Sequence, residues 1–321
     1  MALTEDAGPP PQSALQTAGF RDYALLHVVV LVWGLTAILG KLITLEPGVL
    51  TAWRTGLAAV TLYVFLIFRR EALPHWRASL VMLGTGLLIG LHWFLFFLSG
   101  RLGTVSGSLA GASTMALWIA LLEPVMVRGR RWSGAEALLA AGVAAGVMII
   151  QFSDRGLLTG ILAAGVASVF SIINARLVQR HSPLMITALE MTSACALCVV
   201  GSAVLAEKGV PLKILPSAAD WPWVLILALL CTVFAYSACV WLQRRVTPFS
   251  IGMASNLEPV YGMGLAPLVF GAVEHQPLRF YVGSAVIIGF VILHTALTNR
   301  RMANPPALQP ASSPATGSDG G

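Results

Sequence analysis

Apolar runs of about 20 residues follow one another along most of the chain, and short polar stretches separate them. A helix of about 20 residues crosses the hydrocarbon core of a bilayer, which is about 30 Å thick. The pattern predicts ten transmembrane helices, at 23–44, 48–68, 78–99, 104–126, 134–152, 157–178, 184–206, 220–242, 248–271 and 279–297. The flanking stretches 1–22 and 300–321 are polar and rich in Pro, Ser and Gly, which predicts disordered cytoplasmic tails.

Composition places the chain among integral membrane proteins with an all-α fold. Of its 321 residues 57% are hydrophobic and 11% are charged, whereas soluble domains average about 25% charged residues. The net charge of +6 does not indicate a nucleic-acid partner, because the basic residues lie in the predicted turns. With a cytoplasmic N-terminus, 13 Lys and Arg fall on the inner side and six on the outer side. This follows the positive-inside rule and predicts a multi-pass protein of the bacterial inner membrane with both termini in the cytoplasm.

The two halves of the chain are weakly similar to each other. Thr51-Ala-Trp-Arg54 corresponds to Thr187-Ala-Leu-Glu190 at an offset of 136, and the segment 101–106 corresponds to 245–250 at an offset of 144. A duplicated unit of five helices must enter the membrane from the opposite face. We therefore expect two inverted five-helix repeats, 23–153 and 154–299, around a central cavity.

Glu258 is the first candidate for a functional site, because it lies about ten residues, or about 15 Å, into the ninth predicted helix. Ionisable residues at this depth normally face a water-filled cavity or a partner. Pro259 follows directly and is expected to kink the helix, and Asn256 adds an amide nearby. Glu258 is interpreted as a substrate or proton site. The alternative is a structural carboxylate bonded to a neighbouring helix.

Arg54 and Glu190 occupy equivalent places in the second and seventh predicted helices. Arg54 suits a carboxylate or phosphate, and Glu190 suits an amine or a proton. The alternative for both is snorkelling to the nearer interface or pairing with another residue. The aromatic stretch His92-Trp93-Phe94 is expected to turn only His92 or Trp93 inward. Further candidates for the cavity wall are Trp33, Trp118 and Tyr236.

Catalytic, metal and nucleotide motifs do not stand out. Cys195-x-x-Cys198 lies in an apolar helix without a second ligand pair, so two packing residues are the preferred interpretation. The six histidines lack the spacing of His-Glu-x-x-His, and no P-loop occurs. We expect no metal and no cofactor. A secondary carrier for a small molecule is favoured over an intramembrane enzyme or a passive channel.

The chain resembles the EamA-type carriers of the drug/metabolite transporter superfamily from residue 23 to residue 299. The resemblance rests on Trp33-Gly-Leu-Thr-Ala-Ile-Leu-Gly-Lys41, Arg54, Glu123-Pro124, Asn174 with Arg176, and Asn256-Leu-Glu-Pro-Val-Tyr-Gly262. It implies two inverted repeats of five helices, alternating access, and transport of amino acids or related metabolites, often outward. We also expect contact with membrane lipid and a monomer or homodimer. Relatives commonly have Gly-Glu at the end of the ninth helix, whereas here Ala272 follows Gly271 and Glu274 comes two positions later.

Overall fold

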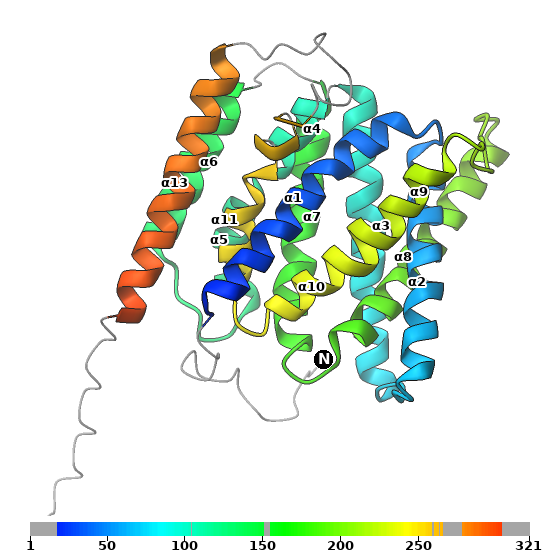
Figure 1. The fold of residues 1–321 in the computed structure, drawn as a ribbon, viewed down its shortest axis with the longest axis horizontal. Helices are drawn as coiled ribbons and strands as arrows, with labels where there is room; N and C mark the ends of the chain where they lie inside the picture. Colours follow the sequence, from blue (N-terminus) through cyan, green and yellow to red (C-terminus); the bar gives the residue numbers. More distant parts are fainter. Residues whose placement is uncertain are drawn as a thin grey trace, which may run out of the picture.

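The computed structural model describes residues 18–103, 105–150, 155–258, 260–262, 264–265 and 278–303. Within these ranges the regular structure is helical (Figure 1). The helices are α1 (Phe20–Leu42), α2 (Pro47–Phe68), α3 (Trp76–Leu102), α4 (Val105–Ala112), α5 (Met115–Met126), α6 (Gly134–Ile150), α7 (Arg155–Leu177), α8 (Pro183–Glu207), α9 (Trp221–Ala228), the π-helix η2 (Leu229–Phe234), α10 (Ala235–Leu242), α11 (Pro248–Ser255) and α13 (Leu278–Ala303).

Length and apolar composition make this a multi-pass membrane protein. Among the described residues, six helices are long and apolar enough to cross a bilayer: Phe20–Leu42, Pro47–Phe68, Trp76–Leu102, Gly156–Leu177, Pro183–Glu207 and Trp221–Leu242. Large apolar side chains such as Val60, Ile67, Leu158 and Ile292 lie exposed on the outside of the bundle. In water such a surface would aggregate, whereas in a bilayer it contacts lipid chains.

The fourth predicted span, 104–126, is not one continuous helix. It is divided into α4 and α5 by a turn at Ser113 and Thr114. The Thr114 hydroxyl donates to the carbonyl of Gly111 (2.8 Å), and the Ser113 hydroxyl donates to that of Leu109 (2.9 Å). Such side-chain bonds compete with the backbone ladder, which explains the break in an otherwise apolar run.

The boundaries predicted for the two tails were wrong by a few residues. Helix α1 begins at Phe20, and its first turn is fixed by Asp22, which accepts a hydrogen bond from the Gly19 amide (2.9 Å) and pairs with Arg245 (3.1 Å). Helix α13 continues to Ala303. The rest of each predicted tail lies outside the described residues.

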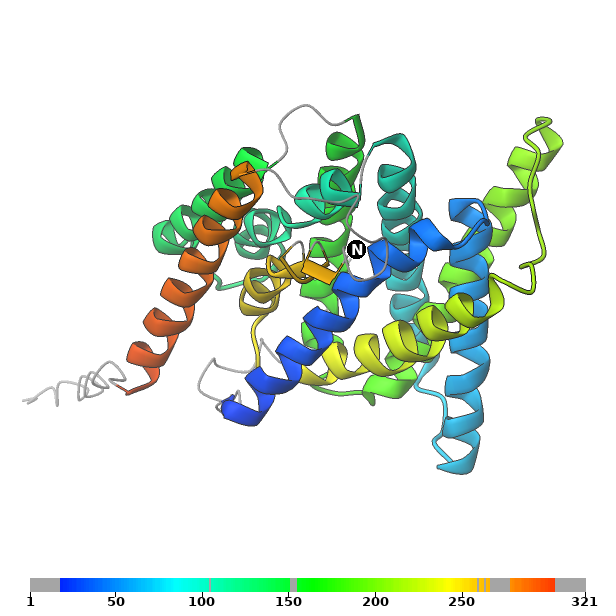
Figure 2. The same ribbon diagram turned by 45° about the horizontal axis from the view of Figure 1, so that its top comes forward.

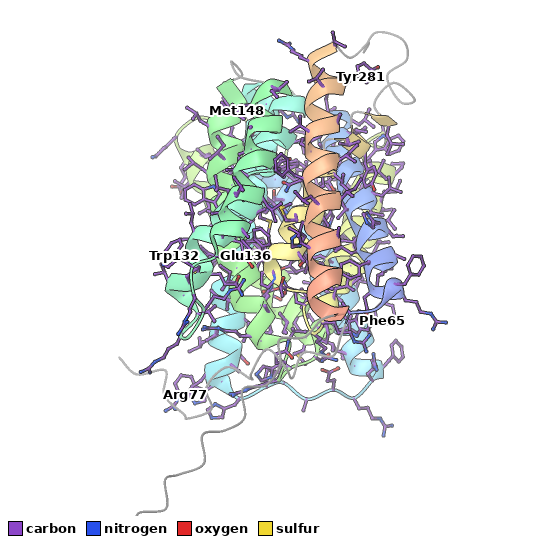
Figure 3. All side chains as sticks on the ribbon, turned by 90° about the vertical axis from the view of Figure 1, so that its left-hand side faces the viewer. Phe65, Arg77, Trp132, Glu136, Met148 and Tyr281 are labelled. Carbon is purple, nitrogen blue, oxygen red and sulfur yellow. The ribbon has the colours of Figure 1, made fainter. Side chains whose placement is uncertain are left out.

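Helices α3, α7 and α8 form a central group in which α3 packs on both α7 and α8, and α2 packs on α8 at the side of the bundle away from α6 and α13 (Figures 1 and 2). Helices α4 and α5 cover α7, and α11 packs on α5. Helices α6 and α13 form a separate pair at the edge, seen in Figures 1 and 2. Figure 3 shows that this pair is antiparallel, because Glu136 and Met148 follow α6 upward while α13 runs downward from Tyr281. The cavity described below lies on the inner side of the central group.

Small residues permit the close approach of α3 and α8. A Cβ atom on Gly86 would lie 2.0 Å from the Ser193 hydroxyl and 2.3 Å from the backbone oxygen of Glu190. A Cβ atom on Gly84, in the same helix, would meet nothing within 4 Å. Close helix contacts through glycine are a common packing device in membranes.

We therefore expect Gly86→Ala to destabilise the protein by about 1–3 kcal/mol through overpacking. Gly84→Ala is the matched control and should leave stability unchanged or slightly raised. Thermal unfolding of both purified variants in detergent measures the difference. Equal melting temperatures would contradict this packing of α3 on α8.

Candidate functional site: a polar cavity within the bundle

A cavity lies among α1, α2, α3, α4, α5, α7, α10 and α11. Its empty volume is about 820 Å³, which includes space open to solvent. It is lined by Trp33, Thr36, Arg54, His92, Trp93, Phe96, Ala112, Met115, Ala164, Ala167, Phe170, Ser171, Asn174, Tyr236, Cys239, Val240, Gln243, Ile251, Ser255 and Glu258. The wall is mostly apolar with a few polar groups, which is the usual composition of a small-molecule site.

Glu258 brings a carboxyl group to this cavity from the segment after α11, and its side chain is only partly buried. The amides of Asn256 and Leu257 bond to carbonyls three residues earlier, at 3.3 and 2.9 Å, so the helix tightens there. A proline at 259 cannot donate to the carbonyl of Ser255, which explains why α11 ends at that residue. Pro259 itself, predicted as the kink, lies outside the described residues.

Arg54 is the cation of the cavity and is 1% exposed. Its Nε donates to the Thr232 hydroxyl at 2.7 Å, and its guanidinium carbon lies 3.8 Å from the centre of the Trp93 ring. Arg54 Nη1 has no hydrogen-bond partner among the described residues. A buried guanidinium with an unused donor is suited to binding an anionic group.

The π-helix η2 places Thr232 where Arg54 reaches it. The Thr232 hydroxyl donates to the carbonyl of Leu227, five residues back, at 2.9 Å. Five residues is the spacing of a π-helix, and single π turns often occur at functional sites. Hydropathy alone predicts a regular α-helix over 220–242 and does not predict the π turn at 229–234.

Glu190 lies behind the cavity wall. It is fully buried, and it accepts a hydrogen bond from the Tyr236 hydroxyl (3.1 Å), which in turn accepts one from the Asn174 amide (3.0 Å). Tyr236 and Asn174 line the cavity, whereas Glu190 does not. Tyr236 also contacts Trp93 edge to face, with ring centres 5.7 Å apart. A continuous series of contacts thus links Arg54, Trp93, Tyr236 and Glu190.

The structure places the other predicted site residues as follows. His92 and Trp93 both line the cavity, although only one of them was expected there, and His92 Nδ1 lies 2.8 Å from the carbonyl oxygen of Ala163. Trp33 also lines it. Trp118 is not a lining residue and lies beside Gly165. Asn256 is buried outside the lining, with its amide nitrogen 3.9 Å from the Met253 sulfur.

Sequence reasoning missed several lining residues. Gln243 was not a candidate from the sequence, but its amide donates to the Ser171 hydroxyl (2.9 Å) and bridges the end of α10 to α7 beside the cavity. Phe170 was one apolar residue among many. No signal in a single apolar run distinguishes a residue facing the cavity from one facing lipid. Glu123 lies outside the cavity wall and forms an ion pair with Arg130 at 3.5 Å.

Comparison with known proteins gives a family match over the second half of the chain. Residues 154–296 match the model of the EamA-like transporter family, which confirms the resemblance to EamA-type transporters of the drug/metabolite superfamily. A solved structure titled "Crystal structure of protein" is similar, with a TM-score of 0.68 and 19% identity, covering 86% of this chain and 99% of the other. At that identity the likeness shows the fold. Comparison with curated proteins gives no match.

Proposed function

We propose that the protein is a secondary transporter that moves zwitterionic metabolites of the amino-acid type, outward, through the cavity between Arg54 and Glu258. The observation that carries the proposal is that one cavity presents a buried guanidinium and a carboxyl group on largely apolar walls. A guanidinium binds a carboxylate, and a carboxylate binds an ammonium group. The aromatic rings of Trp33, Trp93 and Phe170 add apolar contact for a side chain of the substrate.

Alternating access by two inverted repeats is part of the proposal, and two arginine contacts support it. Arg101, near the end of α3, donates to the carbonyls of Ile43 and Leu45 in the turn after α1, both at 2.9 Å. Arg244, just after α10, donates to the carbonyls of Val178 (3.0 Å) and His181 (3.1 Å) in the turn after α7. The two turns lie at opposite ends of the bundle in Figure 1, as an inverted duplication requires.

These contacts favour a register of the proposed repeat that differs by one residue from the sequence match. The sequence match pairs Arg101 with Arg245, but the equivalent contacts pair it with Arg244, an offset of 143 in place of 144. At 143, Met115 corresponds to Glu258 and Ala112 corresponds to Ser255, and these four residues all line the cavity. The offset of 144 would place Thr114 opposite Glu258, whereas the register that the contacts favour places Met115 there.

Contacts between helices also support the correspondence of the two proposed repeats. Helix α2 packs on α8 and α6 packs on α13, so each of these helices contacts its counterpart in the other proposed repeat. The first residues of α1 and the last of α13 also lie toward the same end of the bundle in Figure 1. This agrees with placing both termini in the cytoplasm and the protein in a bacterial inner membrane. An intramembrane enzyme or passive channel has no comparable observation in its favour.

A metabolite survey tests the proposed function. The chain is overproduced in a bacterial host, and intracellular and extracellular pools are compared with those of a host carrying the empty vector. We expect one or a few amino-acid-type zwitterions to rise outside the cell. Unchanged pools on both sides would contradict a carrier for these solutes, and export of simple anions alone would contradict the role of Glu258.

A further inference from the structure

A second hollow lies on the outer surface of the bundle, between the end of α2, the start of α8 and the face of α10. We call it the lateral groove, and we define it by Arg69, Arg244, Val233, Phe234, Ser237 and Trp241. Its empty volume, which includes open solvent, is about 1070 Å³. The central cavity and this groove share no lining residue.

The polar end of the lateral groove carries a net positive charge. Arg69 follows α2 and Arg244 follows α10, and Glu71 is the one carboxylate that lines the groove. In the described part of the chain none of these three residues takes part in an ion pair. The Arg244 guanidinium is held at the rim by its bonds to the carbonyls of Val178 and His181. Arg69 is exposed at the same end of the groove, and two cations against one carboxylate are suited to a phosphate group.

The rest of the groove is apolar and leads toward the middle of the bundle. Phe234 is 43% exposed and precedes Arg244 by ten residues, which corresponds to about 15 Å along the helix. Trp241, over which the Arg245 guanidinium lies at 4.9 Å, stands between the two at the level where membrane tryptophans commonly sit. This gradient from cationic to apolar matches a phospholipid with its headgroup at the arginines and an acyl chain along Phe234.

Ser237 provides a separate sign that the groove is incomplete without a ligand. Its side chain is 6% exposed and lines the groove, yet its hydroxyl oxygen has no hydrogen-bond partner among the described residues. A buried hydroxyl without a partner is costly in an apolar environment. An ester oxygen of a lipid accepts such a bond.

We propose that the lateral groove is a binding site for an anionic phospholipid, whose phosphate is held by Arg69 and Arg244 and whose acyl chain covers Val233 and Phe234. Basic pockets between transmembrane helices on the side rich in Lys and Arg are a known means of binding anionic headgroups. The proposal is independent of the transported substrate, because no residue of the central cavity takes part.

Native mass spectrometry of the purified protein with phosphatidylglycerol or with phosphatidylcholine of the same acyl chains tests the site. We expect the wild type to prefer phosphatidylglycerol, and we expect Arg69→Gln to weaken phosphatidylglycerol binding about fivefold, the effect of one lost cation near the membrane surface. Arg77→Gln is the charge control, since Arg77 is exposed at the same end of the bundle in Figure 3 but outside the groove.

A second pair of variants tests the apolar part. Val233→Trp fills the groove and should remove the preference for phosphatidylglycerol, whereas Leu230→Trp, on an exposed position outside the groove, should keep it. Equal binding of both lipids by the wild type would overturn the proposal. So would a preference that survives both Arg69→Gln and Val233→Trp.

Discussion

Replacing Arg54 with alanine should lower the transport rate roughly a hundredfold. A hydrogen bond to a charged group contributes about 1.5–3 kcal/mol, and losing it in the bound state of the carrier corresponds to about 10- to 100-fold. Arg54 lies in the cavity wall with Nη1 unpartnered, so its loss removes the donor proposed for the substrate carboxylate. The measurement is uptake of the surveyed solute into proteoliposomes.

Arg54→Lys and Thr232→Val separate charge from position. Lysine keeps the positive charge, so partial activity is expected. Its ammonium group lacks the planar guanidinium that stacks on Trp93 and can donate two parallel hydrogen bonds to a carboxylate. Thr232→Val removes the partner of Nε and keeps the guanidinium, and it should cost less than Arg54→Ala. Indistinguishable transport by Arg54→Lys and Arg54→Ala would contradict substrate binding by Arg54 and leave only a structural role in its contacts with Thr232 and Trp93.

Asp220→Asn should lower the melting temperature in detergent by about 5 °C, because one carboxylate organises a whole turn. Asp220 accepts hydrogen bonds from the Thr44 amide (2.8 Å), the Thr44 hydroxyl (2.9 Å) and the Ser217 amide and hydroxyl (2.9 and 2.6 Å). Lys213 pairs with it at 2.9 Å and also contacts Thr44. These contacts join the turn after α1 to the start of α9. They therefore connect the two proposed repeats at one end of the bundle.

The pH dependence of this effect has a definite sign. Burial alone would raise the pKa of the Asp220 carboxyl, but the hydrogen bonds from Lys213, Ser217 and Thr44 outweigh it and hold the pKa well below its usual range. Its contribution is therefore present above the ordinary pKa of about 4 and is lost as the pH falls toward the folded value. The difference between wild type and Asp220→Asn should be constant from pH 7 to 5 and should narrow below about pH 4. A difference that widens on acidification would contradict this account.

Hydropathy predicted much of the architecture, because lipid exposure imposes long apolar helices on the sequence. The predicted spans 23–44, 48–68 and 184–206 each begin and end within three residues of the helices α1, α2 and α8. What it missed depends on side-chain bonds within the apolar runs, as at Thr114, where α4 and α5 separate, and at Thr232, where the π turn forms. Single hydroxyl groups cause both features and barely change hydropathy.

The charged residues of the site were predictable from the sequence, whereas the residues that tertiary packing brings to it were not. Glu258 and Arg54 were identifiable because a charge deep in an apolar run needs a reason, and both line the cavity. Glu190 is also a charge deep in an apolar run, but it lies behind Tyr236. Its depth along the helix does not show whether its side chain reaches the cavity. Gln243 and Asn174 reach the cavity through the crossing of α10 and α7, which is a tertiary property. The predicted role of Gly271, Ala272 and Glu274 concerns positions outside the described residues.

The role of Glu258 is tested most directly by comparing it with Glu123, since each of these two glutamates lies in an apolar run and directly precedes a proline. Glu258 lines the cavity, whereas Glu123 pairs with Arg130 and does not line it. Proteoliposomes carrying Glu258→Gln or Glu123→Gln are compared with wild type for uptake of the surveyed solute between pH 5.5 and 8.5. We predict that Glu258→Gln loses transport at every pH while Glu123→Gln keeps most of it. Wild-type transport by a stably inserted Glu258→Gln over the whole range would contradict the claim that this cavity carries the substrate.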